Sequence, residues 1–171
     1  AVVRLMRTRE AVRTLLAIFD EADRATQTVV DITAAGIIPA ALEMIDQLAI
    51  EAVEKVSPSG YPTDAAAVLL VEIEGVREHT ERGMALVQSI CKRNGAREVR
   101  LAKDEADRQL LWKGRKGAFG ALGQLAPNYY VQDGVVPRSR LPEIMRRVAE
   151  ISRRYGLRIA NVFHAGDGNL H

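Results

Sequence analysis

Short apolar runs alternate with longer segments of helical periodicity along the first third of the chain. Residues 12–19 are mostly apolar, which is typical of a strand. Residues 20–35 repeat apolar side chains at helical spacing, and Asp20 is the expected N-cap of that helix. A second apolar run predicts a strand over residues 39–45, and residues 46–56 predict a helix that ends before a loop rich in serine, glycine and proline. This part of the chain is therefore expected to alternate strand, helix, strand and helix.

The same alternation continues through the rest of the chain. Residues 66–73 form an apolar run that predicts a strand, and residues 76–93 predict a helix that ends at an Asn-Gly pair. Asp104 has an aspartate three positions later, a pattern similar to a capping box that predicts the start of another helix. The remaining predicted elements are strands over residues 2–6, 97–102, 129–136 and 158–163 and a helix over residues 137–155.

Strands separated by helices are compatible with two architectures. A doubly wound parallel sheet is one of them, but no glycine-rich phosphate-binding loop follows the first strand, and polar positions interrupt the strands. We therefore predict an α+β fold with ferredoxin-like split-βαβ halves, in which an antiparallel sheet has its helices packed on one face. The halves correspond to residues 10–65 and 66–171, as a degenerate structural repeat, and the 171 residues form a single domain.

The composition favours a globular protein and argues against nucleic-acid binding and against a membrane span. The formal net charge of +2 is too small to indicate a nucleic-acid partner. Six arginines gather between residues 138 and 154, but two glutamates lie among them, which is typical of a solvated helix face. No apolar run approaches the roughly 18 residues that a transmembrane helix needs.

The single cysteine indicates the cellular compartment, and the ends of the chain indicate whether the sequence is part of a longer protein. Cys91 excludes an internal disulfide and fits a reducing compartment, so we expect a cytoplasmic protein. Its place in a helical pattern predicts a buried position in the core. The chain begins at Ala1 without an initiator methionine or a signal-like segment, and it stops inside a predicted hairpin. We therefore expect a piece of a longer protein.

Two histidines bracket a turn in the last eight residues, His-Ala-Gly-Asp-Gly-Asn-Leu-His. The residues between them tolerate tight reversal, which predicts an antiparallel hairpin with a loop at residues 166–169. In that register His164 lies directly opposite His171, with Cβ atoms roughly 4.5–5.5 Å apart, so the two imidazoles can chelate one divalent metal. Zinc and similar metals normally need at least three protein ligands, so a third would have to come from elsewhere. A turn with two surface histidines is the alternative interpretation.

Arg115 is the second candidate for chemistry. It follows Trp112 by three positions, so both lie on one helix face, and nearby small residues leave room for a bidentate carboxylate. An ordinary exposed helix charge is the alternative. Glu43 lies inside an apolar run and needs a partner if it is buried, for which an arginine on a neighbouring strand is expected. Glu72 and Glu74 fit a solvent-exposed edge of a sheet.

A third polar cluster lies on the strand predicted over residues 129–136. Tyr129 and Tyr130 are expected to pack against neighbours while their hydroxyls contact water. Asp133 precedes Gly134, which is more typical of a turn than of a general base. We assign no catalytic role to this cluster.

Four segments of the chain, taken together, resemble one protein family. They are residues 39–46 (Pro-Ala-Ala-Leu-Glu-Met-Ile-Asp), 111–116 (Leu-Trp-Lys-Gly-Arg-Lys), 129–137 (Tyr-Tyr-Val-Gln-Asp-Gly-Val-Val-Pro) and the His-x-Gly-Asp-Gly-Asn-x-His signature of residues 164–171. In their order and spacing the chain is similar, over essentially its whole length, to the C-terminal substrate domain of FAD-linked 2-hydroxy-acid oxidases and dehydrogenases. Within that family it most resembles the D subunits of bacterial glycolate oxidases, with D-lactate and D-2-hydroxyglutarate dehydrogenases as more distant relatives.

This resemblance implies an oxidoreductase, a flavoprotein that binds FAD mainly through a separate N-terminal domain. It implies that Arg115 binds the carboxylate of a small 2-hydroxy acid and that His164 and His171 bind a divalent metal such as zinc. A third metal ligand, a glutamate, and a proton-accepting histidine are expected farther downstream, so no catalytic residue is assigned within the chain. Phe119 and Val131 stand where the hydroxyglutarate branch has a threonine and a lysine, which favours glycolate or D-lactate as the substrate.

The resemblance also implies partners, and it leaves competing interpretations. The partners are the protein's own FAD domain and other oxidase subunits, with peripheral attachment to the inner face of the membrane as an alternative to a purely cytoplasmic location. The isolated chain is expected to be inactive. A non-catalytic ferredoxin-like module that binds a ligand or a partner subunit is the main competing function. A two-histidine metallohydrolase is a weaker third, because no nucleophile and base stand at a useful spacing.

Overall fold

The computed structural model describes residues 9–126 and 128–171, which form two β-α-β-α units and a C-terminal segment. The first unit comprises β1 (Ala11–Phe19), α1 (Ala22–Ala34), β2 (Ala41–Asp46) and α2 (Gln47–Val56). The second comprises β3 (Ala67–Gly75), α3 (Arg77–Arg93), β4 (Glu98–Leu101) and α4 (Glu105–Leu122). The C-terminal segment comprises β5 (Gly134–Val135), the 3-10 helix η1 (Arg138–Arg140), α5 (Leu141–Tyr155), β6 (Val162–Phe163) and β7 (Asn169–Leu170). The strand expected over residues 2–6 lies outside the described residues.

Five strands form one antiparallel sheet in the order β4-β1-β3-β2-β6. Strand β3 lies between β1 and β2, and β1 lies between β3 and β4, so each β-α-β unit is split by a strand of the other unit. The predicted α+β class, antiparallel sheet and split-βαβ halves are therefore confirmed. The second half ends at Leu122 rather than at residue 171, because the segment after α4 adds only the edge strand β6 and a separate two-stranded sheet of β5 and β7.

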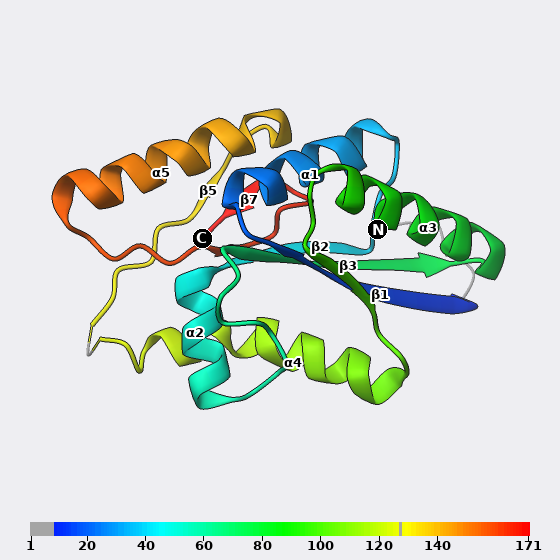
Figure 1. Ribbon diagram of the computed structural model, residues 1–171, viewed down its shortest axis with the longest axis horizontal. Coiled ribbons are helices and arrows are strands. Elements are labelled where there is room, and N and C mark those ends of the chain that lie inside the picture. Colours follow the sequence, from blue (N-terminus) through cyan, green and yellow to red (C-terminus); the bar gives the residue numbers. More distant parts are fainter. Residues whose placement is uncertain (1–8, 127) are drawn as a thin grey trace, which may run out of the picture.

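Helices cover both faces of the sheet, whereas the sequence led us to expect them on one face (Figure 1). Helices α1, α3 and α5 lie on one face, and α2 and α4 lie on the other. Strand β1 contains the reason, because Leu15, Ala17 and Phe19 belong to the first core while Leu16 and Ile18 belong to the second. An uninterrupted apolar run of this kind is typical of a strand buried on both faces. The run therefore contained the signal for two helix layers.

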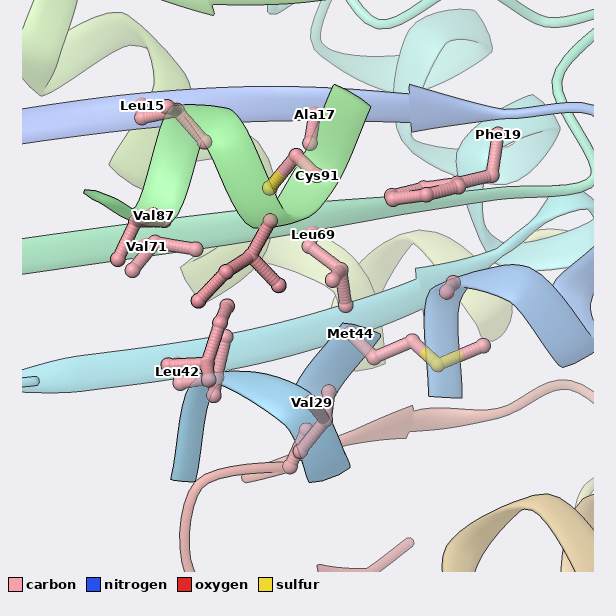
Figure 2. Close-up of a cluster of buried hydrophobic side chains, with 14 of the residues drawn as sticks. Leu15, Ala17, Phe19, Val29, Leu42, Met44, Leu69, Val71, Val87 and Cys91 are labelled. Carbon is pink, nitrogen blue, oxygen red and sulfur yellow. The ribbon is translucent and has the colours of Figure 1, made fainter. Parts of the chain in front are cut away.

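The larger of the two cores lies between the sheet and helices α1 and α3 (Figure 2). Phe19, Met44 and Leu69 of three neighbouring strands belong to it, together with Val29 of α1 and Cys91 of α3. Cys91 is fully buried, and burial raises the pKa of its thiol to about 12. The core position expected for this cysteine is confirmed.

Two segments predicted as strands are mostly irregular. Only Gly134–Val135 of residues 129–136, and only Val162–Phe163 of residues 158–163, form strands. The side chains of Tyr129, Tyr130 and Val131 are exposed, so this segment packs no face against either core. Because β-propensity reflects packing against neighbours, a segment without such neighbours is not held as a strand.

One of the two expected helix caps is present, that of Asp104, and α2 has a further cap that was not predicted. Asp46 caps α2 and Asp104 caps α4, each by accepting a hydrogen bond from a backbone N–H of the first turn. Asp20 does not cap α1, because its carboxylate accepts a hydrogen bond from Arg97 and the helix begins one residue later, with Glu21 at the N-cap position. A tertiary ion pair therefore replaces the local interaction that the sequence suggested.

Gly114 allows α4 to pack closely against the loop between α2 and β3. A Cβ at this position would lie 2.7 Å from Cε2 of Tyr61 and 2.8 Å from Cβ of Ser59. Both of these side chains are buried, and the Tyr61 hydroxyl donates a hydrogen bond to the carbonyl of Leu111 in α4. The loop and the helix therefore leave no space for a side chain here.

We expect Gly114→Ala to lower the free energy of unfolding by about 1–3 kcal/mol, because an added methyl overpacks a filled contact. Gly117→Ala is the matched control, since a Cβ there meets nothing within 4 Å. Alanine in the interior of the same helix should raise the free energy of unfolding by about 0.5–1 kcal/mol. Urea unfolding of the protein that carries this chain measures both effects, and equal shifts in the two variants would contradict the close packing of Gly114.

Candidate active site

Polar and aromatic residues on one side of α4 contact the sheet and the C-terminal hairpin. Arg108, Trp112, Arg115 and Phe119 follow one another at intervals of three or four residues, so they share one face of the helix. Arg108 and Trp112 contact β3, Arg115 contacts β2, and Phe119 contacts the histidine that follows β7. A single helix thereby brings side chains to three separate segments.

Glu72 of β3 is the first buried carboxylate under this helix, with 7% of its surface exposed. Its Oε2 accepts hydrogen bonds from Thr14 Oγ1 at 2.6 Å, Arg108 Nη1 at 2.9 Å and Trp112 Nε1 at 2.8 Å. The expectation of a solvent-exposed edge is wrong for Glu72, because β3 is the central strand of the sheet, whereas Glu74 is exposed.

Glu43 of β2 is the second buried carboxylate, with 5% of its surface exposed. Its Oε2 accepts a hydrogen bond from Arg115 Nε at 2.9 Å, and Arg115 Nη2 lies 2.8 Å from the same oxygen. Its Oε1 lies 2.9 Å from Nδ1 of His164. The expectation that Glu43 pairs with an arginine is confirmed, but the arginine comes from α4 rather than from a neighbouring strand. Sequence reasoning missed its second partner, His164.

The two candidate metal ligands lie side by side. The ring centroids of His164 and His171 are 5.3 Å apart, and the ring planes are nearly perpendicular, at 86°. Nδ1 of His164 faces Glu43, and Nδ1 of His171 lies 3.2 Å from Oδ1 of Asp133. A carboxylate beside Nδ1 holds the proton on that atom, so Nε2 is the nitrogen that keeps a free lone pair. Both rings therefore have the carboxylate support that is common for metal-binding histidines.

The hairpin that presents these histidines differs from the predicted register by two residues. His164 pairs with Asn169, and the N–H of Val162 donates a hydrogen bond to the carbonyl of His171, so the turn comprises residues 165–168. The two histidines are diagonal neighbours rather than directly opposite each other. Because side chains alternate with a period of two, a shift of two residues keeps both imidazoles on one face.

Contacts of Gly168 with Val136, the residue that follows β5, explain this register. The φ of Gly168 is 73°, in the left-handed region, and a Cβ there would lie 2.1 Å from the carbonyl oxygen of Val136. The N–H of Val136 in turn donates a hydrogen bond to the Gly168 carbonyl at 2.9 Å, and β5 pairs with β7. The register of the hairpin is therefore fixed by contacts from outside residues 164–171, and the sequence of these eight residues does not contain that information.

Two further residues touch the candidate site. Phe119 lies edge-on to His171, with ring centroids 5.8 Å apart, and Asp133 pairs with the same histidine. The helix period could have found Phe119, since it follows Arg115 by one turn. Asp133 belongs to an irregular segment and carries no comparable signal, so its expected role as a simple turn residue is incomplete.

The site contains polar atoms that the described residues leave unused. Nη2 of Arg115 is buried and lies 2.8 Å from Oε2 of Glu43, but it makes no well-aligned hydrogen bond within residues 9–126 and 128–171. A bound carboxylate would satisfy it. The two imidazoles offer two metal ligands, and the described residues contain no group of three histidine, cysteine, aspartate or glutamate side chains suited to a metal. The described residues therefore place two imidazoles, which are candidate metal ligands, near a buried arginine.

A cavity of about 810 Å³ opens beside His171. His171 and Asp133 lie on its wall, which is otherwise largely apolar. A small molecule in this cavity would touch the second histidine. Its apolar lining includes Leu122, Leu125, Tyr129, Val148, Leu157 and Leu170.

Comparison with known proteins links this chain to flavin-dependent oxidases. The family model described as FAD linked oxidases, C-terminal domain, matches residues 8–171. The chain is 48% identical over 169 residues to the glycolate oxidase subunit GlcD of Escherichia coli strain K12, which covers 99% of this chain and 34% of that protein. It is 31% identical over 175 residues to the probable mitochondrial D-lactate dehydrogenase of Danio rerio, covering 100% of this chain and 34% of that protein.

A solved structure confirms the fold at lower sequence similarity. The chain superimposes on alkyldihydroxyacetonephosphate synthase with a TM-score of 0.69 at 12% identity, covering 95% of this chain and 35% of that one. At this identity the likeness concerns the fold alone. The chain thus spans about one third of the length of the curated relatives it matches.

We expect Arg115→Met to lower the free energy of unfolding by about 3–5 kcal/mol, because it leaves the buried Glu43 without its cation. The double variant Glu43→Leu/Arg115→Met should recover most of that loss, since it removes both charged partners together. Urea unfolding of the wild type, both single variants and the double variant gives the coupling free energy. A double variant no more stable than Arg115→Met would show that this ion pair does not hold α4 to the sheet.

Proposed function

The chain belongs to the family of the C-terminal domains of FAD-linked oxidases, and we propose that it forms the substrate-binding domain of a flavin-dependent oxidoreductase. The proposed reaction oxidises a small 2-hydroxy acid, glycolate or D-lactate, to the 2-oxo acid. The observation that supports it best is the buried Glu43, which brings Arg115 and His164 to its two oxygens. The proposal concerns the complete protein, of which this chain is the part that would bind the substrate.

Arg115 is proposed to bind the carboxylate of the substrate. Its planar guanidinium suits a carboxylate, because two parallel N–H groups can bind the two oxygens. Glu43 contacts Nε and Nη2, so the terminal N–H groups that point away from Glu43 are the donors left for the substrate. The buried Nη2, which lacks an aligned acceptor among the described residues, supports this role. Holding the carboxylate also orients the α-carbon for reaction.

His164 and His171 are proposed to bind a divalent metal such as zinc through their Nε2 atoms, with a third ligand from outside the described residues. When bound, the metal would supply Lewis-acid polarisation of the substrate hydroxyl, and the flavin would supply the acceptor for the α-hydrogen and its electron pair. Glu43 and Asp133 hold the two imidazoles in the tautomer that leaves Nε2 free. We assign the base that removes the hydroxyl proton, and the residues that bind FAD, to no part of this chain.

Phe119 and Val131 support a small substrate. Phe119 packs against His171, so an apolar ring occupies the position at which the hydroxyglutarate branch has a threonine. Val131 is half exposed and brings no charge to the position at which that branch has a lysine. A second substrate carboxylate would meet no cation at either position. We therefore favour glycolate or D-lactate over 2-hydroxyglutarate.

The partners and the location of the protein follow from the same proposal. We propose that the domain packs against the FAD domain of its own protein and that the complete protein assembles with other oxidase subunits. The E. coli relative is itself named as a subunit of an oxidase. Among the described residues no helix is both long and apolar enough to cross a bilayer. A cytoplasmic location, or peripheral attachment to the inner face of the membrane, stays a prediction.

In the complete protein, we expect anaerobic glycolate or D-lactate to bleach the absorption band of the oxidised flavin. His164→Ala should slow this reduction at least about 10–100-fold, because the metal loses a ligand. Arg115→Lys should raise the KM about 10–100-fold, because lysine cannot donate two parallel hydrogen bonds to a carboxylate. Stopped-flow absorbance at a series of substrate concentrations measures the rate of flavin reduction and its dependence on substrate concentration.

His79→Ala is the matched control for that experiment, since His79 is the remaining histidine and is exposed on α3. Its rates should equal those of the wild type. Equal rates in all three variants would contradict the placement of the site. A complete protein without flavin would instead favour the non-catalytic binding module.

Removal of the metal tests the role of the histidine pair directly. Dialysis of the complete protein against a chelator should abolish flavin reduction while the flavin stays bound, because the substrate hydroxyl is no longer polarised. Added zinc or another divalent ion should restore the rate, and His171→Ala should be purified with little metal. Elemental analysis and the visible spectrum provide the two readouts, and full turnover by metal-free protein would refute the metal site.

A further inference from the structure

Glu43 serves two different functional groups with its two oxygens. Oε2 accepts a hydrogen bond from Arg115 at 2.9 Å, and Oε1 lies 2.9 Å from Nδ1 of His164. The side chain is 7% exposed, so water does not compete for these contacts as it would at the surface. One short, buried group therefore connects the arginine proposed to bind the substrate and a histidine proposed to bind the metal.

This connection has a geometric consequence for the site. A carboxylate is rigid and planar, so partners bound to its two oxygens are held at a fixed separation and in a fixed orientation. The oxygen beside Nδ1 of His164 also selects the tautomer in which Nε2 can bind a metal. Asp133 gives His171 a similar contact, but the Asp133 side chain is 63% exposed, so that pair is much weaker.

Glu72 shows that pinning α4 does not by itself require contact with the site. It lies on the adjacent strand, on the same face of the sheet, and is buried to a similar degree. Like Glu43 it pairs with an arginine of α4, at 2.9 Å from Arg108. Its other donors are Thr14 and Trp112, and no histidine touches it within the part of the chain that the structure describes. The two carboxylates thus share a structural role, and only Glu43 reaches both proposed binding groups.

We propose that Glu43 is a positioning residue that couples substrate binding at Arg115 to metal binding at His164. This inference rests on the proposed function. Glu43 contacts neither the substrate nor the metal and acts through the two side chains that do. The coupling requires both of its oxygens, because loss of either acceptor releases one of the two partners.

The test compares Glu43→Gln with Glu72→Gln in the complete flavoprotein. An amide has a single oxygen, so only one of the two partners of residue 43 keeps an acceptor. We expect Glu43→Gln to weaken zinc binding about 10–100-fold, as measured by competition with a chromophoric chelator, and to raise the KM for glycolate. Glu72→Gln should leave the zinc affinity and the KM within about twofold of wild type, although it loses a comparable buried pair. Urea unfolding of both variants checks that their free energies of unfolding fall by similar amounts.

The outcomes separate this inference from the proposed function. If His164→Ala loses zinc but Glu43→Gln behaves like Glu72→Gln in zinc affinity and KM, the positioning role is overturned and the metal site stands. If His164→Ala retains zinc with unchanged affinity, the proposed site is wrong and the inference fails with it. If Glu43→Gln does not fold, Glu43→Asp replaces it, because aspartate keeps the charge but is one methylene too short to reach both partners. Wild-type zinc affinity and KM in Glu43→Asp would then overturn the inference.

Discussion

Two buried carboxylates under one helix determine the geometry of this protein. Glu72 on β3 and Glu43 on the adjacent β2 lie two residues out of direct register on the same face of the sheet, and each meets an arginine of α4. A buried carboxylate that loses its cation costs about 3–5 kcal/mol. Because the two pairs lie at different points along α4, the helix cannot slide or rotate over the sheet without breaking at least one of them.

The proposed site depends on that fixed helix. With α4 held in place, Arg115 lies over β2 and Phe119 meets His171 one turn later. Gly114, on another side of the same helix, allows the close approach to the loop at Tyr61. The hairpin with the two histidines belongs to the C-terminal segment of the chain, where pairing with β5 fixes its turn. Arg115, proposed to bind the substrate, and His164, proposed to bind the metal, come from distant segments and meet at Glu43.

Local patterns predicted the elements well, and distant contacts explain the failures. The strands and helices from β1 to α4 follow from periodicity, because each buries a face whose spacing is visible in its own residues. The second helix layer was missed, although the continuous apolar run of β1 indicated it. Residue types and spacing singled out His164, His171 and Arg115 as candidates, and their binding roles stay predictions. An arginine partner for Glu43 was expected, but its contact with His164 and that of His171 with Asp133 could not be found, because only the folded chain brings these residues together.

The separation of the site residues along the chain has a consequence for synthesis on the ribosome. Arg115 follows Glu43 by 72 positions, and His164 follows it by 121. At roughly 5–20 residues per second, about 4–14 s pass between the addition of Glu43 and the addition of its arginine. During that interval the nascent β2 contains a negative charge that has no cation and is therefore costly to bury. The helix layer formed by α2 and α4 can be completed over β2 only after α4 has emerged. Glu43 of the first β-α-β-α unit is therefore fully buried only when the second unit has been synthesised.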